Sequence, residues 1–188
     1  MPKKPRKRRF RPMKQGALDG FCGIYSLFNA ARIVDEHLDR DVCHTLFTTC
    51  LRTLEDIQDT VFINVRGMGV RDLIYLSKHV FRPSMGLVHT RPFLRAKPRS
   101  LNDFWETLQD IQRGPEPAGI IISIEALGDG HWTVVESIDD HHLWLADSCE
   151  LEVIARTEAT ICRATCQRPF LINWRDTVVL KRALGYKC

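Results

Sequence analysis

The chain lacks a long apolar run. Its longest unbroken apolar stretch lies near residues 119–124, whereas a membrane-crossing helix needs about 20 such residues. The basic residues at the N-terminus are not followed by the apolar segment of a secretory signal. We therefore expect no membrane span and a cytoplasmic location, with delivery as an effector as the alternative.

The sequence also lacks a Cys-x-x-Cys motif, which often marks a zinc or redox site. The pairs Cys162/Cys166 and Cys43/His44 each offer two zinc ligands, but no second pair stands at a suitable spacing. The cysteines form an odd, scattered set of seven: Cys22, Cys43, Cys50, Cys149, Cys162, Cys166 and Cys188. We interpret them as reduced thiols, mostly buried as small apolar side chains, and expect neither a metal nor a cofactor.

Acidic residues are absent from the first 14 positions. This segment holds eight of the 27 Lys and Arg residues, which leaves 19 basic against 23 acidic residues in the remainder. We expect residues 1–14 to be a basic, disordered or extended tail, and residues 15–188 to form a single domain. The tail is either a solvated arm or a contact for nucleic acid or an anionic surface.

The order of the predicted elements indicates an α+β fold. Apolar residues at helical spacing predict helices over 22–34, 41–54, 70–81 and 101–113, with a short connection through 62–65 and a helix end at Arg82-Pro83. Apolar, β-branched segments predict strands over 86–89, 119–127, 131–138, 143–146, 151–155 and 177–181. Helices first and strands afterwards favour a helical layer packed on an antiparallel sheet.

One cysteine stands where a glycine-rich loop meets the first helix. Cys22 lies between Gly20 and Gly23, at the start of the apolar stripe formed by Ile24, Leu27, Phe28, Ala31 and Val34. The N-terminus of a helix favours negative charge, which is where reactive thiolates are found. Gln15, seven residues earlier, can place an amide donor near the same point. A thiol beside a donor is suited to acyl transfer.

A histidine and an aspartate are predicted to meet on a hairpin about 110 residues later. His131 begins a strand after Gly130, and Asp139-Asp140 forms the turn. If residue 138 pairs with residue 141, His131 falls opposite residue 148, with Asp147 one position away. Asp147 can then orient one imidazole nitrogen and leave the other for Cys22.

Each of these residues has a plain structural alternative. A buried cysteine is more often a core residue than a nucleophile, and a strand histidine is often only hydrogen-bonded. Together, Gln15, Cys22, His131 and Asp147 favour a catalytic site over those alternatives.

The pattern resembles the papain-like cysteine peptidases. The resemblance rests on Gln15, Asp19-Gly20-Phe21-Cys22-Gly23, Gly130-His131-Trp132 and Ala146-Asp147-Ser148, and covers about residues 15–148. It is closest to the compact bacterial type that includes bacteriocin-processing peptidase domains. The interval from Gln15 to Cys22 is one residue longer than is usual in that family, so the loop must bulge. The segment from Asp19 to Cys22 is also similar to the Asp-Gly-x-Cys loop of ovarian-tumour-type deubiquitinases.

The resemblance implies a papain-like fold and cleavage of an amide bond in a peptide or protein through a thioester. By that resemblance Cys22 is the nucleophile, His131 the general acid/base and Asp147 the orienting acid. Gln15 and the Cys22 backbone N–H form the oxyanion hole. The alternatives are an acyltransferase, transglutaminase or deamidase of the same fold, or a non-catalytic binding module whose basic tail contacts nucleic acid.

Overall fold

The computed structural model describes residues 11–16, 19–126, 129–183 and 185. The helical elements are α1 (Cys22–Val34), α2 (Arg40–Glu55), α3 (Thr60–Arg66), α4 (Val70–Leu76), the π-helix η1 (Ser77–Phe81), α5 (Arg82–Met85), α6 (Leu101–Arg113) and the 3-10 turns η2 (Arg156–Glu158) and η3 (Trp174–Asp176). The strands are β1 (Leu87–Thr90), β2 (Gly119–Ala126), β3 (Asp129–Ile138), β4 (His142–Leu145), β5 (Val153–Ala155), β6 (Ala159–Thr160), β7 (Phe170–Ile172) and β8 (Val178–Arg182).

The strands form one sheet that lies mainly in the C-terminal half of the chain. Its main path runs β1-β8-β2-β3-β4-β5, with β7 also paired to β2. All pairs are antiparallel except β6 with β7. The predicted α+β class, with a helical N-terminal part and a largely antiparallel sheet, is confirmed.

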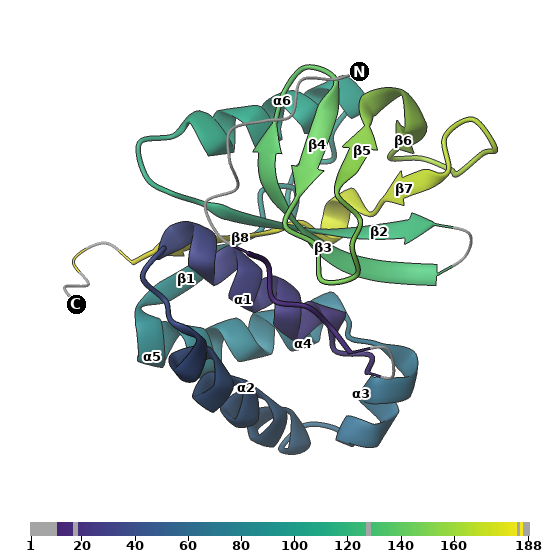
Figure 1. The fold of residues 1–188 in the computed structure, drawn as a ribbon. Coiled ribbons are helices and arrows are strands. Elements are labelled where there is room, and N and C mark those ends of the chain that lie inside the picture. Colours follow the sequence, from purple (N-terminus) through teal and green to yellow (C-terminus); the bar gives the residue numbers. More distant parts are fainter. Residues whose placement is uncertain (1–10, 17–18, 127–128, 184, 186–188) are drawn as a thin grey trace.

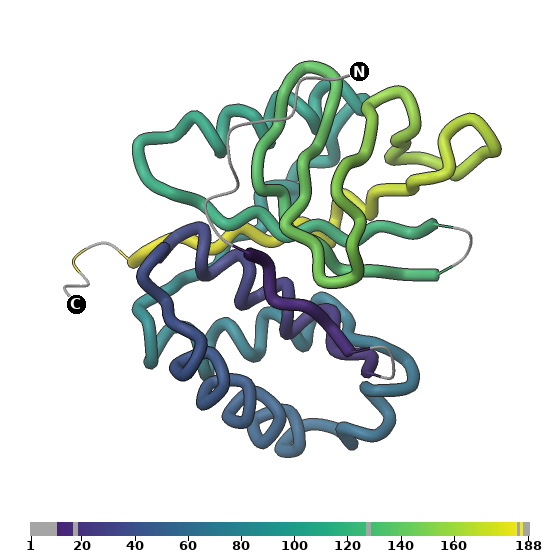
Figure 2. The backbone as a smooth tube through the Cα atoms, viewed as in Figure 1, coloured from purple at the N-terminus to yellow at the C-terminus, as the bar shows by residue number. Residues whose placement is uncertain are grey.

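The sheet separates two cores. Figure 1 shows α1 to α5 on one side of the sheet and α6 on the other, and the same layers can be followed along the chain in Figure 2. Neighbouring residues of β2 point to opposite sides: Ile121 packs with the α1 side chains, whereas Ile120 and Ile122 pack with Phe104 of α6. A strand segment buried on both faces is largely apolar, which explains the run Gly119–Ile122 at the start of β2.

A glycine brings the first helix against the sheet. A Cβ atom added to Gly119 would lie 2.4 Å from the carbonyl oxygen of Ala30, so the backbones of α1 and β2 are in direct contact. Only glycine fits at this crossing. The contact matters because α1 carries Cys22 at its start, and β2 pairs with β3, the strand of His131.

Three helix predictions coincide with the structure, because the helix predicted over 41–54 is α2, one residue longer at each end. Two other predictions, a connection and a helix end, need correction. The predicted helices over 22–34 and 101–113 match α1 and α6, and the Ser100 side chain caps α6 by accepting from Asp103 N. The predicted connection through 62–65 is wrong, because α3 forms there with Asp59 as its N-cap.

The helix that begins at Val70 does not end at Arg82-Pro83. It continues through η1 and α5, and Pro83, which has no backbone N–H to donate, directly follows the π-helical turn of η1. It ends at Gly86, which takes a left-handed conformation with φ of 62°. The short strands β6 and β7 have no counterpart among the predicted elements.

Part of the predicted basic tail lies against α1. Residues 1–10 are outside the described residues, but Pro12 is buried, and Met13 N donates to Asn29 Oδ1 at 2.8 Å. Arg32 of α1 also donates to the Arg11 carbonyl oxygen at 2.8 Å. Among the described residues, no helix is both long enough and apolar enough to cross a membrane.

Candidate active site

Cys22 is the first residue of α1 and is only 7% exposed. Ile24 N and Tyr25 N both donate to the Phe21 carbonyl oxygen, which begins the helix. Among the described residues, no side chain caps this helix start. The first backbone N–H groups of α1 therefore point toward the Cys22 end without a side-chain acceptor, and the positive end of the helix dipole lies there.

The loop before Cys22 is held by α3. Gly20 N donates to Asn64 Oδ1 at 2.8 Å, and Phe21 N donates to Asp19 Oδ1 at 3.2 Å. A Cβ atom at Gly20 would come within 2.2 Å of the Asn64 carbonyl oxygen. The glycine at position 20 is therefore required by close approach of the two backbones, and this approach fixes where Cys22 enters the helix.

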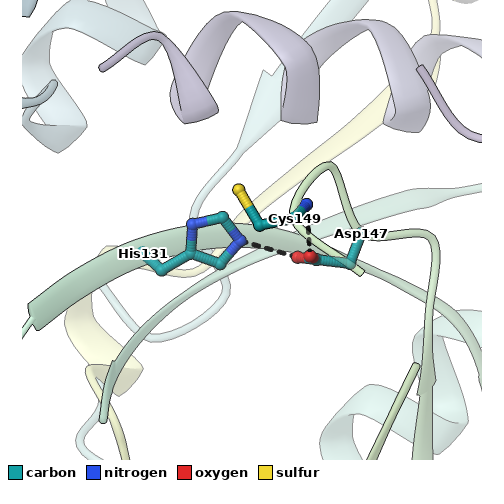
Figure 3. Close-up of side chains that lie close together, drawn as sticks. All are labelled: His131, Asp147 and Cys149. Atoms are coloured by element: carbon teal, nitrogen blue, oxygen red, sulfur yellow. Dashed lines mark hydrogen bonds and ion pairs between the residues drawn. The ribbon is translucent and has the colours of Figure 1, made fainter. Parts of the chain in front are cut away.

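His131 of β3 lies beside Asp147, which follows the end of β4 (Figure 3). His131 Nε2 lies 2.7 Å from Asp147 Oδ2. The Asp147 side chain is almost fully buried, and its other oxygen accepts hydrogen bonds from Cys149 N at 2.7 Å and Leu151 N at 3.1 Å. These bonds hold the carboxylate and thereby fix the orientation of the imidazole ring.

Cys22 lies close enough to the same imidazole to raise its pKa, so His131 interacts with both a thiol and a carboxylate. Burial opposes the charged form of His131, but its hydrogen bonds to Asp147 and Cys22 outweigh burial and raise its pKa to about 10. Burial also acts to raise the pKa of Asp147, yet the bond to His131 lowers it below the usual 3.8. At neutral pH the pair is therefore an imidazolium and a carboxylate, with Cys22 beside the cation.

The hairpin reaches this arrangement in a different register from the predicted one. Ile138 pairs with Leu143, not with residue 141, because the loop between β3 and β4 is longer than a two-residue turn. A bulge in β3 then shifts the pairing by one residue, and Ala146 N donates to the Val134 carbonyl oxygen at 2.9 Å. The predicted register is wrong, but the prediction that the histidine and the aspartate are neighbours is confirmed.

Gln15 lies between the loop that precedes Cys22 and the segment that follows Asp147. Its backbone N donates to the Ser148 carbonyl oxygen at 3.1 Å, and its side-chain oxygen accepts from Cys149 Sγ at 3.4 Å. Its side-chain nitrogen donates to the Asp19 carbonyl oxygen. One of the two amide hydrogens is thus used within the loop, which leaves the second for a ligand.

Cys149 is the residue that the sequence reasoning missed. It was grouped with mostly buried thiols, but Cys149, Cys162 and Cys166 are exposed, whereas Cys22, Cys43 and Cys50 are buried. The ligand atoms of Cys149, His131 and Asp147 lie within 4.8 Å of one another. Its position two residues after Asp147 was the available signal, because a side chain so close in sequence lies near the site.

The two zinc-ligand pairs considered from sequence do not form larger clusters. Neither Cys162 with Cys166 nor Cys43 with His44 belongs to a group of three or more potential metal ligands among the described residues. Cys43 is buried whereas His44 is exposed, so these neighbours face different surroundings. The cluster with metal-binding composition is instead the one at His131.

Comparison with known proteins does not assign this chain to a family. No protein-family model matches the chain, and no curated protein or solved structure matches it.

Proposed function

We propose that this protein is a cysteine peptidase or isopeptidase with a papain-like arrangement of Cys22, His131 and Asp147. The observation that carries the proposal is the position of His131, which pairs with a buried carboxylate and also interacts with a thiol at a helix start. A nucleophile, a base and a group that orients the base are the three parts of nucleophilic acyl transfer.

The first step is attack of the Cys22 sulfur on the carbonyl carbon of an amide. The developing oxyanion is stabilised by the uncapped N–H groups at the start of α1 and by the second amide hydrogen of Gln15. His131, already protonated, donates its proton to the leaving amine, and a thioester on Cys22 remains.

Asp147 acts throughout by holding the ring and stabilising the imidazolium. After the amine leaves, neutral His131 takes a proton from water, which attacks the thioester and releases the acid product. A different acceptor at this step gives acyl transfer instead of hydrolysis, and water attack on a glutamine thioester gives deamidation. The three outcomes share all steps up to the thioester.

The experiment that tests this proposal is acid quenching of the enzyme with a panel of peptide, isopeptide and glutamine-amide substrates, followed by mass spectrometry. We expect an acyl adduct on Cys22 in the wild type, none in Cys22→Ala, and an unchanged yield in the matched Cys162→Ala. Product that depends on added amine assigns acyl transfer. Turnover that persists in Cys22→Ala contradicts the proposal.

The basic tail supplies a separate proposal, contact with nucleic acid. Phosphate contacts made by its eight Lys and Arg residues should weaken steeply as salt rises. Removal of residues 1–10, which contain six of these eight residues, should weaken such binding strongly and leave residues 11–14 in place on α1. Equal binding with and without those residues contradicts a role for the tail.

A further inference from the structure

The side chains around His131 form a set of ligands that catalysis does not require. Nucleophilic chemistry uses Cys22, His131 and Asp147, yet a second thiol, Cys149, lies beside the imidazole and the carboxylate. The ligand atoms of His131, Asp147 and Cys149 all lie within 4.8 Å of one another. Imidazole nitrogen, carboxylate oxygen and thiolate sulfur are the three ligand types that zinc takes in proteins.

We propose that His131, Asp147 and Cys149 bind a zinc ion. Zinc bonds of about 2.0 to 2.3 Å place tetrahedral ligands about 3.3 to 3.8 Å apart. All three ligand atoms lie within 4.8 Å of one another, so the longest separation must shorten by about 1 Å. His131 Nε2 and Asp147 Oδ2, now 2.7 Å apart, must separate by about 0.6 Å to admit the ion between them. The fourth position is open to water.

The surroundings provide both rigid and adjustable ligands. Asp147 is fixed by backbone N–H bonds to one oxygen, so the oxygen that faces His131 is already oriented. Cys149 is exposed, and the partners of its sulfur among the described residues are neutral: the Gln15 amide oxygen and the Ser148 hydroxyl. The thiol can therefore turn toward an ion that enters from solvent, because the bonds it gives up are weak.

The ion changes what the site can do. Zinc on His131 replaces the proton that links the imidazole to Asp147, so the ring no longer serves as acid and base. This inference rests on the proposed function: the zinc-bound protein is inactive, and removal of the ion by a chelator restores its activity. The site differs from a catalytic zinc centre because the metal occupies the groups that the reaction needs.

The test is binding of Zn²⁺ to the full chain, measured by calorimetry and by competition with a chromophoric chelator. We expect one ion per chain in the wild type and in Cys22→Ala, which keeps all three ligands. Cys149→Ser should weaken binding by about tenfold or more. In Co²⁺ titrations the thiolate-to-cobalt charge-transfer band should appear in the wild type and disappear in Cys149→Ser.

The exposed cysteines Cys162 and Cys166 supply the matched control. Their double replacement by serine should leave Zn²⁺ binding unchanged. Loss of binding in that variant, full binding in Cys149→Ser, or no binding in the wild type overturns the proposal. Because Cys22→Ala binds the ion without being able to form a thioester, a failure of the zinc site is distinguished from a failure of the proposed chemistry.

Inhibition by zinc is tested by measuring the alkylation rate of Cys22 rather than turnover. Saturating Zn²⁺ should slow carboxymethylation of Cys22 in the wild type, and the same free Zn²⁺ should slow it less in Cys149→Ser. Addition of a chelator should restore the wild-type rate. If zinc binds at the three ligands but leaves Cys22 alkylation unchanged, the inhibitory role is overturned while the metal site stands.

Discussion

The two sides of the candidate site are built by different forces. On the helix side, Cys22 is placed by close packing, with Gly20 against the backbone of α3 and α1 against the sheet. On the sheet side, His131 and Asp147 are placed by hydrogen bonds and by opposite charge. The helix side should therefore respond to changes of side-chain volume, and the sheet side to changes of charge and pH.

The largest expected change in the free energy of unfolding comes from pH and arises on the sheet side. The pKa of His131 is about 10 in the folded protein against 6.5 for the free side chain. A raised histidine pKa stabilises the fold fully below pH 6.5, and this stabilisation is lost as pH rises through about 10. Each pKa unit corresponds to about 1.4 kcal/mol, so the change amounts to several kcal/mol.

This pH effect is isolated by a difference measurement. The free energy of unfolding of His131→Gln is subtracted from that of the wild type at each pH, which removes other groups that titrate in the same range. The difference should shrink between pH 6.5 and pH 10. It should also shrink in acid, as pH falls through the lowered pKa of Asp147. A difference that stays constant contradicts the ion pair.

A steric change should break the connection between the two sides. In Gly119→Ala the added Cβ would lie 2.4 Å from the Ala30 carbonyl oxygen, so α1 and β2 must separate. We expect a loss of about 3 kcal/mol in the free energy of unfolding, measured by urea titration. The matched change Gly130→Ala meets nothing within 4 Å and should cost about 0.5 kcal/mol or less. Equal losses in the two variants contradict the close packing of α1 on the sheet.

A buried amide also links the helix to the hairpin. Asn29 of α1 accepts from Met13 N and donates to the Ala146 carbonyl oxygen at 3.3 Å, one residue before Asp147. Asn29→Ala leaves these groups without their partner and should cost about 2 kcal/mol. Asn102→Ala, at an exposed position, is the control. If both asparagine variants unfold at the same urea concentration, the link contributes nothing.

The smallest effect is expected from neutralising the buried carboxylate of Asp147. Asp147→Asn keeps the shape of the side chain but removes the charge that favours the imidazolium. We expect Cys22 alkylation at neutral pH to slow by about tenfold. Asp139→Asn removes a carboxylate from His142, 3.3 Å away, and should have no such effect. A comparable slowing in both variants points to a general change in stability rather than to the site.

Much of the fold follows from local sequence, because helix and strand patterns are local. The bounds of α1 follow from its apolar spacing, and Ser100 and Gly114 mark the ends of α6. The missed helix α3 exposes Val61, Phe62 and Val65, so it lacks the buried stripe that identifies a helix. Its position depends on the contact of Asn64 with Gly20, which is remote in sequence.

The candidate site was predictable in its members but not in its details. Cys22, His131 and Asp147 come together although the predicted hairpin register is wrong, since the bulge in β3 compensates for part of the longer loop. Bulges depend on tertiary packing and leave no clear local signal. For the same reason the sequence did not predict that Cys149 would face His131.

The claim that His131 activates Cys22 is tested most directly by the alkylation rate of Cys22 in the wild type and in His131→Ala. Iodoacetamide labels the protein at neutral pH, and peptide mass spectrometry separates Cys22 from the exposed cysteines. The matched control is His44→Ala, an exposed position on α2. We expect His131→Ala to slow labelling of Cys22 by about 100-fold and His44→Ala to leave it unchanged. Equal rates in all three proteins would contradict an activated Cys22 and, with it, the proposed chemistry.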